Sequence, residues 1–287
     1  MKIIIGIILL IIIVCVVSWI IDINRFVIRN YEFSSPKIKK AFRIVLLSDL
    51  HNKDYGNNNE SLIKAIDECA PDAIIIAGDL CNGLKGHSFD TPLSLLSALT
   101  KKYPLYYGMG NHEYRLSIYP KEYGTMWEDY TQKLAELGVH VMNNERSTID
   151  EVGLDIASVT IDKFFYKRFV RTKLSENDMK GYLGSASVDN YQLLIAHNPE
   201  YFEAYSDWGA DLTVSGHVHG GIMRLPLVGG IISPRLVCFP KYSDGEYELE
   251  DKHMVVSCGL GTHTIHVRVF NPGELSVIDL KPGANGN

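Results

Sequence analysis

The chain has 287 residues and a formal net charge of −6 at pH 7, from 34 acidic and 28 basic side chains. An acidic balance without a basic patch lacks the electrostatic footprint of a nucleic-acid-binding protein, so we expect no nucleic-acid partner. Its five cysteines show no C-x-x-C spacing, which argues against a disulfide framework and against a zinc-thiolate site.

The first tenth of the chain is a long apolar run. Residues 3–21 are apolar apart from Gly6 and Ser18. About 20 such residues span a bilayer, and the run has no polar face that would mark an amphipathic helix. A cleavable secretory signal is the alternative, but its apolar region usually covers about 7–15 residues and ends at small side chains, where this chain has Trp19. We predict an uncleaved, single-pass transmembrane anchor over residues 1–22 that contacts the membrane through residues 3–21.

The basic residues that flank this helix bear on its orientation. Lys2 and the terminal amine precede it, whereas Arg25, Arg29 and four further lysines or arginines within residues 37–43 follow it. This excess favours a cytoplasmic main domain. A short amino-terminal tail before a long domain is also compatible with an exported signal anchor, so the sequence leaves both sides open.

Short apolar runs alternate with segments of helical period after the anchor. Residues 23–42 are polar and basic and form either a linker or a first edge strand. We predict helices at 61–70, 91–102 and 121–137, and strands at 43–49, 73–79, 105–108, 139–142, 146–149, 154–160, 192–196, 212–215, 254–257, 268–270 and 275–278. The alternation predicts an α/β domain over residues 43–282, with a second, mixed sheet packed on the first, and a disordered tail at 283–287.

Five short polar blocks stand at the carboxyl ends of apolar runs. They are Asp49-Leu50-His51, Gly78-Asp79, Gly110-Asn111-His112-Glu113, His197-Asn198 and Gly216-His217-Val218-His219-Gly220. Open α/β sheets place their sites at the carboxyl ends of strands, and a mixture of oxygen and imidazole ligands suits two divalent transition ions. A lone Gly-Asp turn would carry almost no weight, but the five blocks together predict a metal-dependent hydrolase.

Some of these positions carry a more specific expectation. In a strand of period two, Asp49 and His51 would point the same way and reach one ion. Asp79 closes the next strand, where its carboxylate could bridge two ions. Asn111 offers a neutral amide oxygen, and His112 would face the substrate as a proton donor. The alternative for this block is a glycine turn with an asparagine helix cap.

The set resembles the calcineurin-like metallophosphoesterases, whose signature is D-x-H, G-D, G-N-H-[DE], H and G-H-x-H. The resemblance runs from about Ile44 to the carboxyl terminus, and the segments SDLHN, AHNP and SGHVHGG are similar to those of the membrane-associated bacterial YkuE-type branch. It implies a four-layered α/β/β/α sandwich and two divalent metal ions, which could be manganese, iron, zinc or cobalt. It further implies a first ion held by Asp49, His51, Asp79 and His219, a second held by Asp79, Asn111, His197 and His217, and His112 as the catalytic residue.

The expected function is that of a membrane-anchored phosphohydrolase in which a metal-bridging hydroxide attacks phosphorus and cleaves a phosphoester or pyrophosphate bond. The substrate would be a phosphorylated small molecule or lipid, and Arg115 could clamp a phosphate oxygen unless it is a solvent-facing helix arginine. A phosphoprotein phosphatase and a general phosphodiesterase are alternatives. A non-catalytic metal-binding scaffold is a further alternative. Such a scaffold could lose ligands freely, whereas this chain retains the expected ligands and His112. Two departures from the family pattern, Cys81-Asn82 and Ile222, could change the pocket beside the ligands.

Overall fold

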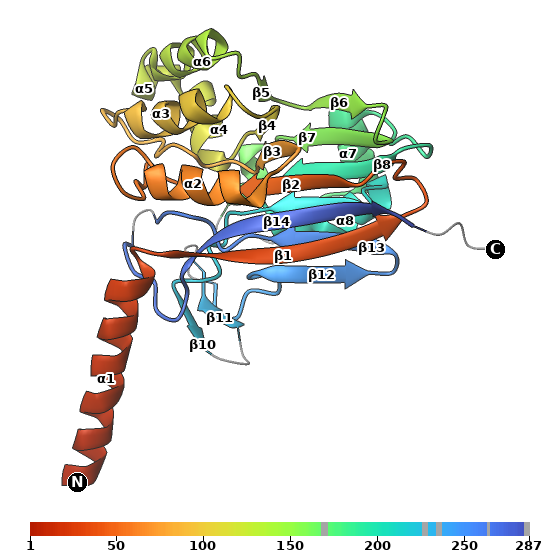
Figure 1. The fold of residues 1–287 in the computed structure, drawn as a ribbon. Coiled ribbons are helices and arrows are strands. Elements are labelled where there is room, and N and C mark those ends of the chain that lie inside the picture. The colour runs from red at the N-terminus through yellow and green to blue at the C-terminus, as the bar shows by residue number, and fades with distance from the viewer. Residues whose placement is uncertain (168–171, 226–228, 234–236, 263–264, 284–287) are drawn as a thin grey trace.

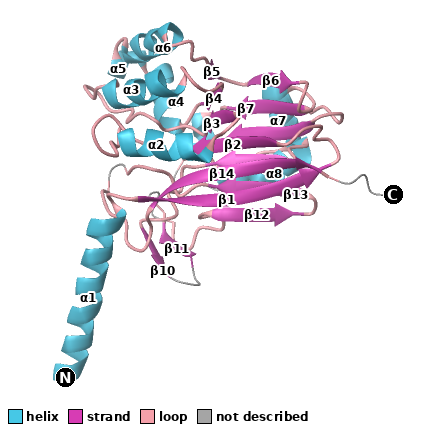
Figure 2. Cartoon of the chain, viewed as in Figure 1, coloured by secondary structure: helices cyan, strands magenta, loops and turns pink. Residues whose placement is uncertain are grey.

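Two mixed β-sheets form the centre of the molecule (Figures 1 and 2). The computed structural model describes residues 1–167, 172–225, 229–233, 237–262 and 265–283, so residues 284–287 of the predicted disordered tail lie outside them. Within the described residues, the first sheet has six strands in the order β1-β14-β2-β3-β4-β5. Their bounds are β1 (Phe26–Ser35), β14 (Gly273–Pro282), β2 (Phe42–Leu47), β3 (Ala73–Ile76), β4 (Leu105–Gly108) and β5 (Val141–Met142).

The second sheet, within the same described part of the chain, has six strands in the order β12-β13-β9-β8-β7-β6. Their bounds are β12 (Gly245–Leu249), β13 (Lys252–Val256), β9 (Leu212–Ser215), β8 (Tyr191–Ala196), β7 (Leu154–Val159) and β6 (Glu145–Ile149). A separate antiparallel pair is formed by β10 (Met223–Leu225) and β11 (Gly229–Ile232). This pair follows the last polar block of the sequence.

Helices cover the outer face of each sheet (Figure 1). On the first sheet lie α2 (Glu60–Cys69), α3 (Asp90–Leu99), α4 (Asn111–Ile118), α5 (Pro120–Tyr123) and α6 (Met126–Glu136). On the second lie α7 (Glu176–Leu183) and α8 (Phe202–Trp208), with short 3₁₀ turns at Lys163–Tyr166 and Pro199–Tyr201. Helix α1 (Lys2–Asp22) projects away from the domain.

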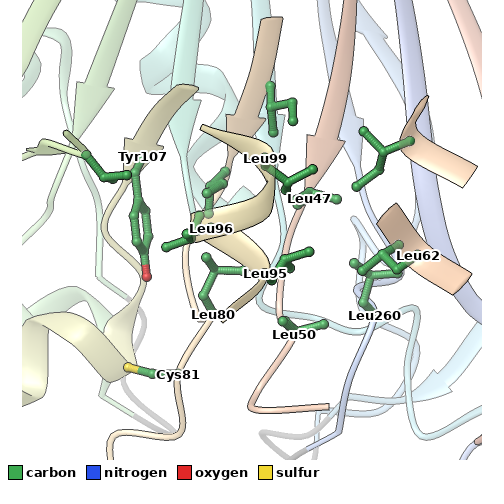
Figure 3. Packing of buried hydrophobic residues seen from close by; sticks show 14 of the residues in the cluster. Leu47, Leu50, Leu62, Leu80, Cys81, Leu95, Leu96, Leu99, Tyr107 and Leu260 are labelled. Carbon is green, nitrogen blue, oxygen red and sulfur yellow. The ribbon is translucent and has the colours of Figure 1, made fainter. Parts of the chain in front are cut away.

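Successive side chains of a strand point to opposite faces of its sheet, and in the strands at the centre of each sheet both sets are buried. On β2, Val45 and Leu47 pack against the helices of the first layer, whereas Ile44 and Leu46 pack between the two sheets. Figure 3 shows Leu47 among the leucines of α2 and α3. Each such side chain contributes about 1.5–3 kcal/mol when fully buried.

Strand β8 shows the same division in the second sheet. Leu193 and Ile195 belong to the cluster between the sheets, and Leu194 and Ala196 belong to the cluster that contains side chains of α7 and α8. Three apolar clusters therefore separate four layers, in the order helices, sheet, sheet, helices. The mixed sheets covered by helices confirm the predicted α/β class, and the order of the clusters is the one expected for an α/β/β/α sandwich.

Two of the predicted elements differ from the structure. The helix predicted over 121–137 is divided into α5 and α6, because Gly124 has a φ of 62° that a helix cannot accommodate. Residues 268–270 do not form the predicted strand: Val269 makes a single bridge to Met223, and Phe270 has a φ of 52°. In both places one residue with positive φ ends the regular segment.

The segment after α1 is part of the folded domain rather than a linker. Its residues form β1, which pairs in parallel with β14 from Phe26 opposite Gly273 to Ser35 opposite Pro282. Of the two interpretations left open by the sequence, the edge strand therefore describes residues 26–35. Among the described residues, α1 is the helix long and apolar enough to cross a membrane, with a mean hydropathy of 3.4 and no part of that apolar stretch buried against the domain.

Candidate metal centre

The polar blocks converge at one edge of the two sheets. Strands β2, β3 and β4 run parallel in the first sheet, and β7, β8 and β9 run parallel in the second. The blocks follow the carboxyl ends of β2, β3, β4, β8 and β9 in turn. Most of their polar side chains are buried, so the two sheets together enclose a polar site between apolar clusters.

One group of donor atoms surrounds His51. Its Nε2 lies 3.2 Å from Nε2 of His219 and 3.7 Å from Oδ1 of Asp49. Nε2 of His219 is itself 3.2 Å from the same Asp49 oxygen. Such a set of nitrogen and oxygen donors can hold a divalent transition ion.

A second group of donor atoms surrounds Asp79. Its Oδ2 lies 3.1 Å from Nε2 of His197, 3.8 Å from Nε2 of His51 and 3.9 Å from Nε2 of His112. His217 forms a further group with Asp79 and His197, in which the donor atoms all lie within 4.8 Å of one another. The carboxylate of Asp79 therefore stands between two donor sets and can contribute to both.

Asn111 can also supply an oxygen ligand to a metal ion. Its side-chain Oδ1 is buried and accepts no hydrogen bond from the described residues, which would cost about 1–3 kcal/mol if nothing bound it. The next residue, His112, donates its backbone N–H to Oδ1 of Asp79 at 2.8 Å, so the first turn of α4 lies against that carboxylate. The residues present at this edge thus fit a pair of divalent ions.

Several candidate ligands have unusual backbone geometry. Asp49, His51, Asp79, His217 and His219 all have φ between 47° and 71°, in the left-handed region that costs a non-glycine residue about 1–3 kcal/mol. Strand β2 ends before the first of these residues, so the placement of its two ligands in one donor group comes from the left-handed conformations of Asp49 and His51. The reason expected from the sequence, alternation along a strand, is wrong.

At Asp79 the backbone strain is offset by buried hydrogen bonds that the Glu113 carboxylate accepts. Its Oε2 accepts the backbone N–H of Asp79 at 2.9 Å and that of Gly110 at 3.0 Å. Its Oε1 accepts the hydroxyl of Tyr107 at 2.9 Å and the N–H of Cys81 at 3.3 Å. Burial raises the pKa of Glu113. This carboxyl group thereby joins the ends of β3 and β4 and fixes the direction of Asp79.

His112 is oriented by a backbone donor. The N–H of Gly83 donates to Nδ1 of His112 at 3.0 Å, so the neutral imidazole carries its proton on Nε2, the atom that faces Asp79. Arg115 Nη2 lies 3.3 Å from the same Nδ1 and donates to the carbonyl oxygen of Gly83 at 2.7 Å. The guanidinium therefore contacts the back of His112 and is not a solvent-facing helix arginine.

The carboxylates and imidazoles of the site shift one another's pKa values. Burial raises the pKa of Asp49 and of Asp79, but the imidazoles beside them outweigh burial and hold both pKa values well below their usual range. Burial lowers the pKa of His197, but the carboxylates of Asp79 and Asp49 outweigh it and raise that pKa to about 10. A cation that bound here would take the place of the imidazole proton.

Comparison with known proteins agrees with this geometry. Residues 42–221 match the family model described as calcineurin-like phosphoesterase. The chain belongs to this family. It is therefore a hydrolase of phosphoric esters, and its relatives agree with the bacterial YkuE-type branch that the motifs indicated.

Three relatives illustrate how far the similarity of this phosphoesterase extends. The uncharacterized metallophosphoesterase YkuE of Bacillus subtilis (strain 168) is 29% identical over 249 residues, covering 84% of this chain and 79% of the relative. The phosphodiesterase YaeI of Escherichia coli (strain K12) is 25% identical, with 77% and 76% covered. The transmembrane protein with metallophosphoesterase domain of Danio rerio is 24% identical, with 86% of this chain and 54% of the relative covered. The phosphoesterase thus spans about half of that last protein.

Two side chains of the phosphoesterase that support the site were not singled out from the sequence. Asn271 Nδ2 donates to the carbonyl oxygens of His219 and Gly221 at 2.7 and 2.6 Å. Arg268 is buried and donates at 2.6 Å to the carbonyl oxygen of Gly261, which lies 3.3 Å from Nδ1 of His219. The bonds of Asn271 join residues about fifty positions apart, and the bond of Arg268 closes a loop. No local sequence pattern therefore indicates either contact.

The residues that depart from the family pattern contact a buried carboxyl group or the backbone. Cys81 is buried beside Glu113, with Sγ 3.6 Å from Oε1, in the apolar cluster of the first helical layer (Figure 3). Asn82 donates its side-chain N–H to the carbonyl oxygen of His51 at 3.0 Å. The backbone N–H of Ile222 donates to the carbonyl oxygen of Ile232 at 2.7 Å, immediately before the β10–β11 pair begins.

Proposed function

We propose that this protein is a membrane-anchored, dinuclear phosphohydrolase that cleaves a phosphoester or pyrophosphate bond in a phosphorylated small molecule or lipid. The proposal rests chiefly on the position of Asp79, whose carboxylate is within reach of both donor sets. The first ion would be held by Asp49, His51, Asp79 and His219, and the second by Asp79, Asn111, His197 and His217. Mixed nitrogen and oxygen ligands suit manganese, iron, zinc or cobalt.

When bound, two such ions acidify water and neutralise charge on a phosphoryl group. The chain itself supplies the proton. Because Nδ1 of His112 accepts the N–H of Gly83, the proton on Nε2 is available to the leaving oxygen. Arg115, in contact with Nδ1 and with the Gly83 carbonyl, would hold the ring in this orientation rather than clamp phosphate as the sequence suggested.

Asp79 and its neighbours would be fixed before substrate arrives. The backbone N–H of His112 donates to Asp79 Oδ1, and Glu113 holds the backbone N–H of Asp79. Donors that are fixed in this way need no rearrangement as negative charge develops on the phosphoryl oxygens, which is the main advantage of a preorganised site. The same restraints would favour a reaction without a covalent intermediate on the protein.

The chemical class of the substrate separates the remaining alternatives. A relative named as a phosphodiesterase favours diester cleavage, whereas a phosphoprotein phosphatase would need to accept a bulky polypeptide. A non-catalytic scaffold would bind ions without turnover. All three predict different outcomes when phosphomonoester, phosphodiester and pyrophosphate substrates are compared.

The experiment uses the full-length protein in detergent with Mn²⁺, Fe²⁺, Zn²⁺ or Co²⁺ supplied in turn. We expect turnover of at least one aryl phosphodiester, phosphomonoester or lipid pyrophosphate, and loss of both turnover and metal content in Asp79→Asn. Asp155→Asn is the matched control, because Asp155 is a largely buried carboxylate of β7 that bonds Thr148 and Gln192 instead of the site. No turnover with any of these ions would contradict the enzymatic proposal.

The side of the membrane needs a separate measurement. A carboxyl-terminal reporter that is active in only one compartment would give the orientation of the domain relative to α1. A cytoplasmic signal is expected from the basic residues that follow the helix. An exported signal would reverse the proposed orientation without affecting the proposed chemistry.

A further inference from the structure

A set of large apolar side chains is exposed around the end of the domain where α1 is attached. Phe239 has 63% of its surface exposed and directly follows Cys238, which forms a β-bridge with Ile232. The set, which we name the apolar rim, consists of Leu225, Ile232, Val237, Phe239, Ile265 and Phe270. Contiguous exposed apolar side chains on a folded domain mark an interaction surface.

The last turns of α1 are hydrogen-bonded to the loop that carries two of these residues. Trp19 Nε1 donates to the carbonyl oxygen of His266 at 2.8 Å. Ser18 Oγ accepts the N–H of Phe270 at 2.7 Å, and Asp22, which is buried, accepts the N–H of Asn271 at 3.0 Å. The loop at 265–271 is therefore fixed at the level of the helix end, and Trp19 is a residue type enriched at membrane interfaces.

The β10–β11 pair is tied to the same loop. Val269 donates to the carbonyl oxygen of Ile222 and accepts the N–H of Arg224, and it forms a bridge with Met223. Figure 1 shows β10 and β11 on the side of the sheets from which α1 leaves. Arg224, the charged residue of β10, is turned inward and paired with Asp244, so its charge does not interrupt the exposed apolar surface.

The rim also borders the metal centre. The residues that line a cavity of about 180 Å³ are Glu200, Glu203, His217, Val218, Ser233, Val237, Pro240, Lys241 and Tyr242. The cavity therefore contacts both the candidate ligand block, through His217 and Val218, and the rim, through Val237. A molecule with its phosphate at the metal centre could extend through this cavity towards the rim.

We propose that the apolar rim is a second membrane contact, which rests on the bilayer surface beside α1 and directs the cavity of the metal centre towards the lipid headgroups. This inference depends on the membrane anchor of the proposed function and narrows its substrate to a phosphate group held at the membrane surface. A bilayer is the occupant because the loop that carries Ile265 and Phe270 is hydrogen-bonded to the end of α1, so any membrane that α1 crosses lies at the level of this loop. Apolar side chains beside an interfacial tryptophan are typical of such monotopic contacts.

The test uses full-length protein in phosphatidylcholine vesicles with a fluorophore on Cys238. This cysteine is exposed between Val237 and Phe239. Cys15→Ser and Cys69→Ser remove the partly exposed thiols, and buried Cys81 and Cys258, whose pKa values burial raises, stay unreactive. We expect quenching by a lipid that carries a nitroxide near the glycerol end of its acyl chain, and protection from aqueous iodide.

The matched control places the fluorophore at the opposite end of the sheets. Val188 is 82% exposed and precedes the amino-terminal end of β8, so Val188→Cys with Cys238→Ser should give the reverse result, with quenching by iodide alone. A Phe239→Asp, Phe270→Asp double variant should lose lipid quenching at Cys238. Its hydrolysis of a water-soluble phosphodiester should stay unchanged, because neither residue belongs to the metal centre.

Three outcomes would overturn the inference. Equal iodide quenching at positions 238 and 188, without lipid quenching, would mean that the rim faces water. Protection of Cys238 from both quenchers would mean that a protein surface covers the rim. Failure of the protein to float with vesicles would refute the anchor itself, and this result is separate from activity, so it leaves the proposed chemistry to its own test.

Discussion

Gly110→Ala is the sharpest single-atom perturbation of the site. Gly110 has a φ of −92° and a ψ of −178°, an extended conformation open to any residue, so alanine brings no backbone strain. A Cβ at this position would lie 2.1 Å from Oδ1 and 2.4 Å from the backbone nitrogen of Asp79. Contacts that short cannot be relieved by a flexible side chain alone, because one of the two atoms belongs to the backbone.

The expected effect has two parts. Inserting a methyl group into a closely packed contact costs about 1–3 kcal/mol, which lowers the melting temperature by roughly 2–12 °C for a protein of this size. Asp79 has to move away from Gly110, and it is the carboxylate within reach of both donor sets. We therefore expect Mn²⁺ affinity to fall about 10–100-fold, the range typical when the support of a ligand is disturbed.

Gly181→Ala is the matched control. Gly181 lies inside α7 and has no heavy atom within 4 Å of an added Cβ, so the same chemical change should stabilise the helix by about 0.5–1 kcal/mol. Thermal unfolding and calorimetric Mn²⁺ titration of both variants in detergent measure the two effects. If Gly110→Ala keeps the melting temperature and the Mn²⁺ affinity of the parent protein, this result would contradict the close contact between Gly110 and Asp79.

Three further predictions follow from the same geometry. Burial lowers the pKa of His197, but Asp79 and Asp49 raise it to about 10, so a bound metal ion must displace a proton from this imidazole. At pH values below that pKa, Mn²⁺ affinity should increase about tenfold for each unit by which the pH is increased, and calorimetry should detect the release of about one proton. His112→Asn should lower turnover about 10²–10⁴-fold with unchanged metal content by mass spectrometry, and parallel loss of metal would refute its role as proton donor. Arg268→Met removes a buried donor to five backbone carbonyl oxygens and should cost about 3–5 kcal/mol of unfolding free energy in urea titrations; a smaller loss than that of Gly110→Ala would contradict it.

The parts of the molecule that depend on neighbouring residues could be predicted from the sequence. The apolar runs at 43–49, 73–79 and 105–108 correspond to β2, β3 and β4, because a strand buried on both faces needs consecutive apolar residues. The prediction of α1 had the same basis, since its apolar length is a local property. The candidate ligands were found because each polar block directly follows such a run.

The tertiary structure decided what local patterns do not encode. The sequence indicated one helix at 121–137, and a single left-handed glycine divides it. It also gave no reason for Glu113 to fix Asp79 and no sign of Asn271 at His219, because these contacts join segments that are adjacent only after both sheets have formed.

The sequence by itself determined which residues could bind metal and that an apolar helix precedes them, because both are written in the order of neighbouring side chains. The left-handed turns that aim Asp49 and Asp79, the sharing of Asp79 between two donor sets, and the fixing of the rim loop to the end of α1 were decided only by the packing of the two sheets. Their physical reason is the same in each case: a strained turn or a buried hydrogen bond is stable only where distant segments close around it.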